Sequence, residues 1–595
     1  MIKKFFLVFF SLITFSLFCQ EVITSLISDP CLLNSSQHKS LSKTSLNLPF
    51  FDDFSYNSSN VNFLLWEQSS VRVNRCYAIN PPSLGVATFD GLNENGLARD
   101  FSSINSSDPS DTLLSKKINL NGINAAFFMF YFQGKGLGES PENQDRLVLE
   151  FLQDTIWVQK WFSDGQSMQE FERVVVLIDS SHYLVNDFQF RFRNYATVSG
   201  NFDHWHIDYL KIDELLSASD TSILNDVSFV YNSPSFLKRY SQMPWNHFLN
   251  NESIELKDSI NIFLRNNNAS INVDFQYNVF ENDNQIFHYP LIGVSRNVSV
   301  LDYDSIGNYS FSNPPIDIQS NVFNSFQPDS ASFLIQYIIG TSNSDKKIND
   351  TLTHEQNFYS NFAYDDGTAE SAYGININGA KLAYEFKLNR PDTLRAIQMY
   401  FPQMLDSVSD IPFKLTIWND ISGQGNVIYQ QNVFPVHTTD GSYHTYYLDS
   451  LFQLVGTFYI GWEQTTNELL NIGLDMNNEA NSYMFYNVGS GWEMSSYLGS
   501  WMIRPVLSMN DILSDVTINN ISYKIYPNPA KHHLFIKTTL NNNIISVYSS
   551  QGNLTKRIEV NSGLSTIDIR EFSSGIYFIE ILNSNEISYQ KIIIQ

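Results

Sequence analysis

One short stretch of the chain carries side chains with the spacing of a metal site. It reads His204-x-His206-x-Asp208. Alternate residues of a β-strand point to the same face, so two imidazoles and a carboxylate would lie together there, opposite Trp205 and Tyr209. These are side chains that a zinc ion accepts. The alternative, which we favour, is that all three face solvent on the outer side of a closing strand, because the sequence places no third histidine or general base near them.

Four aspartates suggest a different ion. Asp52 and Asp53 stand at the start of a predicted sandwich, and Asp203 and Asp208 stand at its end. If the entering and closing strands are neighbours, the four carboxylates could meet and would repel one another without a counter-ion. Oxygen ligands suit Ca²⁺, so a structural calcium is the one cofactor that the sequence suggests. The competing interpretation is that Asp52 and Asp53 cap a turn by accepting hydrogen bonds from backbone amides.

A tryptophan in the third quarter of the chain is a candidate ligand-binding residue. The stretch from Phe413 to Trp418 alternates, with Trp418 on the face of the polar residues Lys414 and Thr416. An exposed indole there would be a stacking surface for a sugar ring. The alternative is that Trp418 belongs to the core, as large aromatic side chains commonly do.

Signatures of common enzymes are missing from the sequence. It contains no H-E-x-x-H, no G-x-S-x-G and no phosphate-binding Walker loop. The glycines from Gly134 to Gly138 are not followed by a helical pattern, which argues against a dinucleotide site. A net charge of −25 argues against a nucleic-acid partner. We therefore expect a protein that is not an enzyme.

We expect β-strands to position these residues, because the composition of the chain favours strands. Aromatic residues make up 14% of the chain and charged residues only 16%, and turn-forming Asn and Ser are abundant. The run from Ala125 to Phe132 is continuously apolar, which predicts a strand buried on both faces. Phe188 to Arg193 alternates phenylalanine with polar residues, which predicts a strand whose phenylalanines point into a core and whose arginines point to solvent. The fold class expected is all-β.

The chain is long enough for about four domains. The stretch that starts with Phe50-Phe51-Asp52-Asp53-Phe54 and ends with Asp203-His204-Trp205-His206-Ile207-Asp208 is similar to jelly-roll modules of the MAM and lectin-like kind in surface proteins. We therefore expect a jelly-roll sandwich at residues 49–213. Residues 226–357 suit an immunoglobulin-like or fibronectin III-like spacer, with Met243-Pro244-Trp245 as a plug between domains. Residues 362–507 suit a second jelly-roll-like sandwich, and 508–523 a polar linker.

The first residues have the pattern of a secretory signal. Lys3 and Lys4 precede an apolar run that ends at Phe18 and is too short to span a bilayer. This predicts a signal peptide at residues 1–19, and no later stretch reads as a transmembrane helix. Cys31 and Cys76 then remain, and whether they form a disulfide stays open.

The last residues carry four motifs in order: Tyr526-Pro527-Asn528-Pro529, a Val-Tyr turn that ends at Gly552, Gly575-Ile576-Tyr577, and an apolar terminus. With these motifs, residues 524–595 resemble the type A sorting domain of the type IX secretion system. The resemblance implies a small β-sandwich, export across the outer membrane by the type IX machinery, and often removal of the domain with attachment to surface polysaccharide.

These observations predict a secreted or cell-surface protein made of tandem β-sandwiches. We expect it to act by binding, as an adhesin-like or matrix component. A glycan-binding protein that uses Trp418 is the second interpretation, and a secreted hydrolase is the least favoured, because sequence alone cannot assemble a catalytic cluster across a sandwich.

Overall fold

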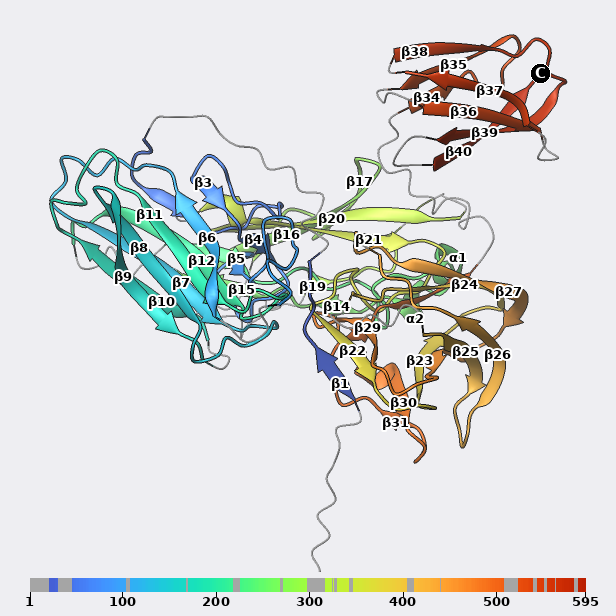
Figure 1. Cartoon of the computed structure of the whole chain (residues 1–595), viewed down its shortest axis with the longest axis horizontal. Helices are drawn as coiled ribbons and strands as arrows, with labels where there is room; N and C mark the ends of the chain where they lie inside the picture. Colours follow the sequence, from blue (N-terminus) through green and yellow to red (C-terminus); the bar gives the residue numbers. More distant parts are fainter. Residues whose placement is uncertain are drawn as a thin grey trace, which may run out of the picture. The chain divides into compact units, whose positions relative to one another are not determined.

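The structure is a computed structural model in which nearly all the regular secondary structure of the described residues is β-strand (Figure 1), which confirms the all-β prediction. It describes residues 21–29, 45–102, 107–166, 170–217, 225–267, 271–296, 316–323, 325, 329–341, 346–403, 411–438, 440–507, 523–538, 543–549, 554–561, 563–582 and 587–595. None of the helices in these ranges is long and apolar enough to span a membrane. The chain divides into two compact units, Met1–Asp511 and Ile512–Gln595. The predicted signal peptide and nearly all of the predicted linker lie outside the described residues.

The first part of the larger unit is a sandwich of two antiparallel sheets. One sheet has the order β10-β7-β12-β5-β4, with β2 added beside β12, and the other has the order β3-β6-β11-β8-β9. The strands are β2 (Phe50–Asp52), β3 (Trp66–Ser69), β4 (Arg72–Asn74), β5 (Val86–Phe89), β6 (Asp108–Ser115), β7 (Ala126–Gly134), β8 (Arg146–Gln153), β9 (Ile156–Asp164), β10 (Glu172–Ile178), β11 (Phe190–Ala196) and β12 (Trp205–Glu214).

Phenylalanines fill the space between these sheets. Phe128 and Phe190 meet edge to face with their ring centroids 4.6 Å apart. Such pairs add about 0.5–1.5 kcal/mol to the burial of the rings. All nine residues of β7 are buried, which confirms the strand predicted to be covered on both faces. In β11 the phenylalanines are buried, while Arg191 and Arg193 both pair with Glu150 of β8.

A bulge in β12 changes which side chains face this core. The register against β7 shifts between Asp208 and Lys211, and Tyr209 has a positive φ of 51°. Such a bulge inserts an extra residue and re-aims the side chains after it. Leu210 therefore packs in the sandwich core, while Tyr209 packs in a separate cluster with Phe127 and Tyr131. The prediction that Tyr209 shares a face with Trp205 is wrong for this reason.

The middle part contains one five-stranded sheet, β17-β16-β20-β21 with β18 beside β16, and two short strand pairs, β13-β15 and β14-β19. Its elements are β13 (Val227–Phe229), α1 (Trp245–Phe248), α2 (Glu252–Glu255), β14 (Ser259–Ile260), β15 (Leu264–Asn266), β16 (Val273–Glu281), β17 (Asn284–Tyr289), β18 (Ser295–Arg296), β19 (Ile316–Asp317), β20 (Ala331–Thr341), η3 (Lys347–Asn349) and β21 (Thr351–Phe358). Trp245 is fully buried and packs against Phe358.

The third part has a six-stranded sheet, β26-β25-β28-β23-β30-β31, and two smaller ones, β27-β24-β33 and β1-β22-β29-β32. Its elements are β1 (Val22–Thr24), β22 (Ser371–Ile375), β23 (Lys381–Lys387), β24 (Asp392–Met399), β25 (Phe413–Asp420), β26 (Asn426–Val433), β27 (His444–Leu454), β28 (Thr457–Glu463), β29 (Leu470–Asp475), η4 (Asn481–Tyr483), β30 (Met484–Asn487), β31 (Glu493–Met494), β32 (Ser500–Trp501) and β33 (Ile503–Leu507).

The middle and third parts share one continuous hydrophobic cluster. Tyr240 of the middle part packs on Phe362 and Tyr364 at centroid distances of 4.7 and 4.8 Å. The His247 ring, buried in α1, lies 3.0 Å from a carboxylate oxygen of Asp392 at the start of β24. The residues around Trp245 therefore bridge these two parts, as the predicted plug would.

The residues after the predicted signal peptide connect distant parts of the larger unit. β1 pairs with β22, from Val22 opposite Gly374 to Thr24 opposite Ala372. A few residues later, Asp29 forms a buried ion pair with Arg72 of the first sandwich. The segment 21–29 therefore adds an edge strand to the third part and ends against the first.

The smaller unit is a sandwich of a three-stranded sheet, β34-β35-β38, and a four-stranded sheet, β37-β36-β39-β40. Its strands are β34 (Tyr523–Tyr526), β35 (His533–Thr538), β36 (Asn543–Ser549), β37 (Leu554–Val560), β38 (Gly563–Asp568), β39 (Gly575–Leu582) and β40 (Ile587–Ile594). Isoleucines at alternate positions, such as Ile579 and Ile581, form most of its core.

Candidate functional site

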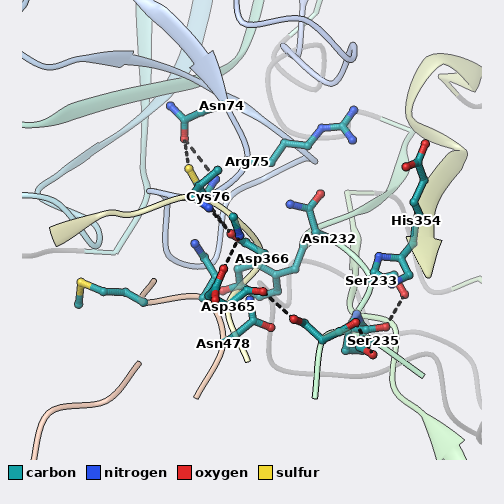
Figure 2. A pocket seen from close by; sticks show the side chains of 18 of the residues that line it. Asn74, Arg75, Cys76, Asn232, Ser233, Ser235, His354, Asp365, Asp366 and Asn478 are labelled. Atoms are coloured by element: carbon teal, nitrogen blue, oxygen red, sulfur yellow. Dashed lines mark hydrogen bonds between the residues drawn. The ribbon is translucent and has the colours of Figure 1, made fainter. Parts of the chain in front are cut away.

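A polar cleft of about 1100 Å³ lies within the larger unit, where loops of its three parts meet. Figure 2 shows Arg75, Asn232, His354 and Asp366 around it. The first sandwich contributes residues near 56–59 and 72–79, the middle part contributes 231–235 and 353–357, and the third part contributes 365–368 and 476–478. No single part of the sequence could have indicated this cleft, because its walls lie up to several hundred residues apart.

The wall from the third part is built on buried charge. Asp365 forms an ion pair with Arg504 of β33 and also accepts a hydrogen bond from the Tyr443 hydroxyl. Next to it, the Asp366 amide donates to Asp475 at 2.8 Å. Burial, followed by the charge of Asp366, raises the pKa of Glu370 to about 8. Asp365 is therefore held in place by Arg504 and Tyr443.

The opposite wall joins the first sandwich to the middle part. The Arg75 guanidinium donates to the Ser55 carbonyl at 2.8 Å. The Tyr231 hydroxyl donates to the Asn80 side-chain oxygen and accepts from the Asn80 amide, both at 2.7 Å. Arg75 and Tyr231 are only half-buried. This wall therefore offers a cation and an aromatic ring that are partly open to the cleft.

His354 of β21 lines the cleft between these walls. Burial, helped by the charge of Lys257, lowers the pKa of His354 to about 4. Its ring is therefore neutral at physiological pH. A neutral imidazole can donate or accept one hydrogen bond at each nitrogen, depending on the tautomer.

The structure does not support a zinc site at His204, His206 and Asp208. All three side chains are buried, so the favoured prediction that they face solvent is wrong too. The two ring nitrogens of His206 lie within hydrogen-bond distance of Thr88 Oγ1 and the Lys135 carbonyl, and Asp208 accepts hydrogen bonds from Ser83. The side chains and loops that cover this face of β12 come from segments distant in the sequence. Alternation within the strand could not predict that the face is buried.

The electrostatics of this stretch agree with a structural role. Burial lowers the pKa of His204 to about 3 and that of His206 to about 4. Both rings are therefore neutral. His204 also stacks on Tyr77 with the ring centroids 5.0 Å apart.

The four predicted calcium ligands do not all come together. The entering strand β2 does pair with the closing strand β12, and Asp53 lies near Asp208, but Asp203 lies with other carboxylates. Asp52 accepts hydrogen bonds from the Trp66 indole and the Phe54 amide. Asp53 accepts from the Ser55 amide and from Asn349. The alternative prediction, that these two carboxylates bond to backbone amides, is thus confirmed.

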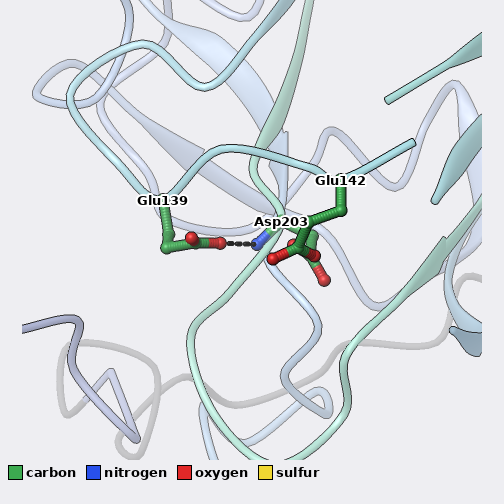
Figure 3. Close-up of side chains that lie close together, drawn as sticks. All are labelled: Glu139, Glu142 and Asp203. Atoms are coloured by element: carbon green, nitrogen blue, oxygen red, sulfur yellow. Dashed lines mark hydrogen bonds between the residues drawn. The ribbon is translucent and has the colours of Figure 1, made fainter. Parts of the chain in front are cut away.

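Asp203 lies instead beside Glu139 and Glu142, where one ligand atom of each lies within 4.8 Å of the others (Figure 3). The prediction that Asp203 shares a site with Asp52 fails because Asp203 precedes β12, at the loop end of the sandwich, whereas Asp52 and Asp208 lie within strands. The sequence does contain a pattern that could have indicated this cluster, because Glu139, Glu142 and Asp145 follow the spacing E-x-x-E-x-x-D.

Trp418 is not available to a sugar. Its indole is 0% exposed and packs edge-on against Trp492 at 5.6 Å. The turn at Gly425 also lies against its ring. The predicted exposure is wrong because segments of β26 and the region after β30 cover this end of β25. Cys76 forms no disulfide with any of the residues that the structure describes, and Cys31 lies outside them. A disulfide between the two stays a prediction.

In the smaller unit, the Tyr-Pro-Asn-Pro segment anchors the end of the chain. Asn528 donates from its amide nitrogen to the Lys591 carbonyl at 3.0 Å and accepts from the Ile593 amide at 2.8 Å. Pro529 is followed by Ala530, which bridges to Ile594 in parallel. Tyr577 donates to the Ser573 carbonyl at 3.0 Å. Gly552 lies outside the described residues, and Gly575 begins β39.

Comparison with protein families identifies this unit. Residues 524–595 match the family described as the secretion system C-terminal sorting domain. These residues are a type IX secretion sorting domain. The sorting domain makes the protein a secreted one, released or attached at the outer surface, and implies interaction with the type IX secretion machinery. None of the curated proteins matches the chain significantly.

Solved structures show only remote similarity. The tandem CBM22 domains of Paenibacillus barcinonensis Xyn10C are 7% identical at a TM-score of 0.20, with 73% of this chain and 99% of that one covered. PorZ, a surface component of the type IX system of Porphyromonas gingivalis, is 10% identical at a TM-score of 0.12, with 44% of this chain and 35% of that one covered. TM-scores this low do not identify a shared overall fold.

Proposed function

We propose that this secreted protein is an adhesin-like binding protein of the cell surface and that its polar cleft binds a glycan. The observation that carries the proposal is the cleft itself, with a volume of about 1100 Å³. Sites for drug-sized molecules span about 300–1,000 Å³. A cleft slightly larger than that range has room for several sugar rings.

The lining suits sugar hydroxyls. Each hydroxyl both donates and accepts, and the cleft offers amides, hydroxyls and carboxylates, among them Asn232, Asn478 and Asp366. Tyr56 and Tyr231, both half-buried, add aromatic surface at its edge. The net charge of −25 disfavours strongly anionic polysaccharides through long-range repulsion. A neutral glycan is therefore the expected ligand.

Binding without catalysis is part of the proposal. Asp365, one of the acidic residues of the cleft, is held by Arg504 and Tyr443. Glycoside hydrolysis needs two carboxyl groups that can exchange protons on either side of the bond. The proposal therefore predicts that a bound glycan is released unchanged.

A glycan array with the full secreted chain tests this proposal. We expect a neutral oligosaccharide to bind, and Asn232→Ala and Arg75→Ala to weaken the binding at least several-fold. Asn121→Ala, an exposed amide outside the cleft, is the matched control. The assignment is refuted if no glycan binds, or if both cleft variants bind as tightly as the wild type. New reducing ends after incubation with the bound glycan would show a hydrolase instead.

A further inference from the structure

The first sandwich carries a cluster of three carboxylates at one end, with a fourth, that of Asp145, beside it. The loop from Glu139 to Asp145 joins β7 to β8, and Asp203 lies just before β12. Glu139, Glu142 and Asp203 each direct a carboxylate oxygen into a space within which these atoms are no more than 4.8 Å apart (Figure 3). Asp145 is fully buried and adds its charge to all three.

Backbone hydrogen bonds hold the cluster in place. The Glu139 amide donates to His204 Nδ1 at 3.0 Å, and the His204 amide donates to the Glu139 carbonyl at 3.1 Å. The Thr197 amide donates to Asp203 Oδ2 at 2.6 Å, and the Glu142 amide donates to Asp145 Oδ2 at 2.7 Å. His204 therefore fixes the loop. The second carboxylate oxygen of each aspartate, Oδ1, takes part in none of these hydrogen bonds.

Two buried oxygens of the cluster have no hydrogen-bond partner. They are Oδ1 of Asp203 and Oδ1 of Asp145, in side chains that are 1% and 0% exposed. None of the ion pairs found among the described residues involves any of the four carboxylates. Buried carboxylate oxygens without a partner are costly, and buried charges are normally paired or bound to a metal.

Burial and mutual repulsion act on the carboxyl groups of this cluster. Burial, followed by the charges of neighbouring carboxylates, raises the pKa of Asp203 to about 7. Burial, followed by its contact with Asp145, raises the pKa of Glu142 to about 7. Such carboxylates are poorly stabilised as anions by the protein alone.

We propose that Glu139, Glu142, Asp145 and Asp203 form a Ca²⁺ site that locks the β7–β8 loop to the segment before β12. Ca²⁺ takes six to eight oxygen ligands in irregular geometry, and Glu142 is exposed, so water completes the shell. Mg²⁺ needs a more regular octahedron, and Zn²⁺ prefers nitrogen and sulfur ligands. The ion contributes stability and loop order to the sandwich and is separate from the cleft.

Calorimetric titration of the chelator-treated full chain with CaCl₂ tests the site, together with melting curves in Ca²⁺ and in EGTA. We expect the wild type to bind Ca²⁺ and to melt at higher temperature with it. Glu142→Gln, at an exposed position that folding tolerates, should weaken Ca²⁺ binding at least tenfold. Asp203→Asn should remove one equivalent of bound Ca²⁺.

The control is Asp154→Asn, an exposed aspartate in the β8–β9 turn of the same sandwich. It should bind Ca²⁺ as the wild type does. The proposal is overturned if the wild type shows neither binding nor a melting shift, or if Glu142→Gln and Asp203→Asn both bind as tightly as the wild type. Equal stabilisation by MgCl₂ and CaCl₂ at the same concentration would overturn the choice of ion.

Discussion

The buried Glu370 makes the larger unit less stable as the pH rises. Its side chain is 3% exposed and accepts a hydrogen bond from the Met476 amide at 2.9 Å. Burial and the nearby Asp366 raise its pKa from 4.5 to about 8. The folded state therefore binds more protons than the unfolded state between these two values. Stability is highest below pH 4.5 as far as this group is concerned, and it is lost as the pH rises towards 8.

The size of the effect follows from the shift. One group that is protonated when folded and ionised when unfolded changes the free energy of unfolding by about 1.4 kcal/mol per pH unit. From pH 5.5 to 7.5 this amounts to about 2–3 kcal/mol. Glu370→Gln keeps the shape and the acceptor for Met476 but removes the titration. We expect the stability of the variant relative to the wild type to rise by about 3 kcal/mol between pH 5 and pH 7.5.

Urea unfolding followed by tryptophan fluorescence at half-unit steps from pH 5 to 8 measures this difference. Glu479→Gln, at an exposed position of the same region, is the control and should follow the wild type. The reasoning fails if the difference in stability between Glu370→Gln and the wild type does not change with pH.

Three further outcomes are expected. Trp418→Ala should destabilise the larger unit by about 3–5 kcal/mol in urea unfolding, because it leaves a cavity where the buried indole was. Glycan binding should be unchanged. A loss of glycan binding with unchanged stability would contradict the burial of Trp418. Asn528→Ala removes both hydrogen bonds to β40, so amide exchange at Ile593 should rise at least tenfold, and unchanged exchange would show that the segment does not hold the terminus. Glu21 accepts hydrogen bonds from Tyr373 and Ser495, so Glu21→Ala should raise amide exchange in β1, with exchange in β35 as the internal reference.

Local pattern was enough to predict a good part of this protein. The period of two in β11 and the continuous apolar run in β7 were both reproduced, because each depends only on which face of a strand meets the core. The sorting domain was identified for the same reason. Its motifs are short and can be recognised locally in the sequence. The contacts of Asn528 with β40, in contrast, join residues 63 and 65 positions apart and were visible only in the fold.

Long-range packing decided the sites. Trp418 stands on the polar face of an alternating strand, yet it is buried because Trp492 and the turn at Gly425 cover it. Alternation in a sequence shows which side chains share a face of a strand. It does not predict whether another segment of the chain covers the more polar face.

The same limit applies to the acidic residues. Asp203 is predicted as a candidate ligand together with Asp52, Asp53 and Asp208, yet it lies beside Glu139 and Glu142, because only the folded chain brings the loop from Glu139 to Asp145 against it. The cleft has the same origin, since its walls come from three parts of the larger unit. The amino-acid sequence by itself determined the strands and the secretion signal, which depend on neighbouring residues. The tertiary structure alone decided which carboxylates and aromatic rings meet, because those contacts join residues far apart in the chain.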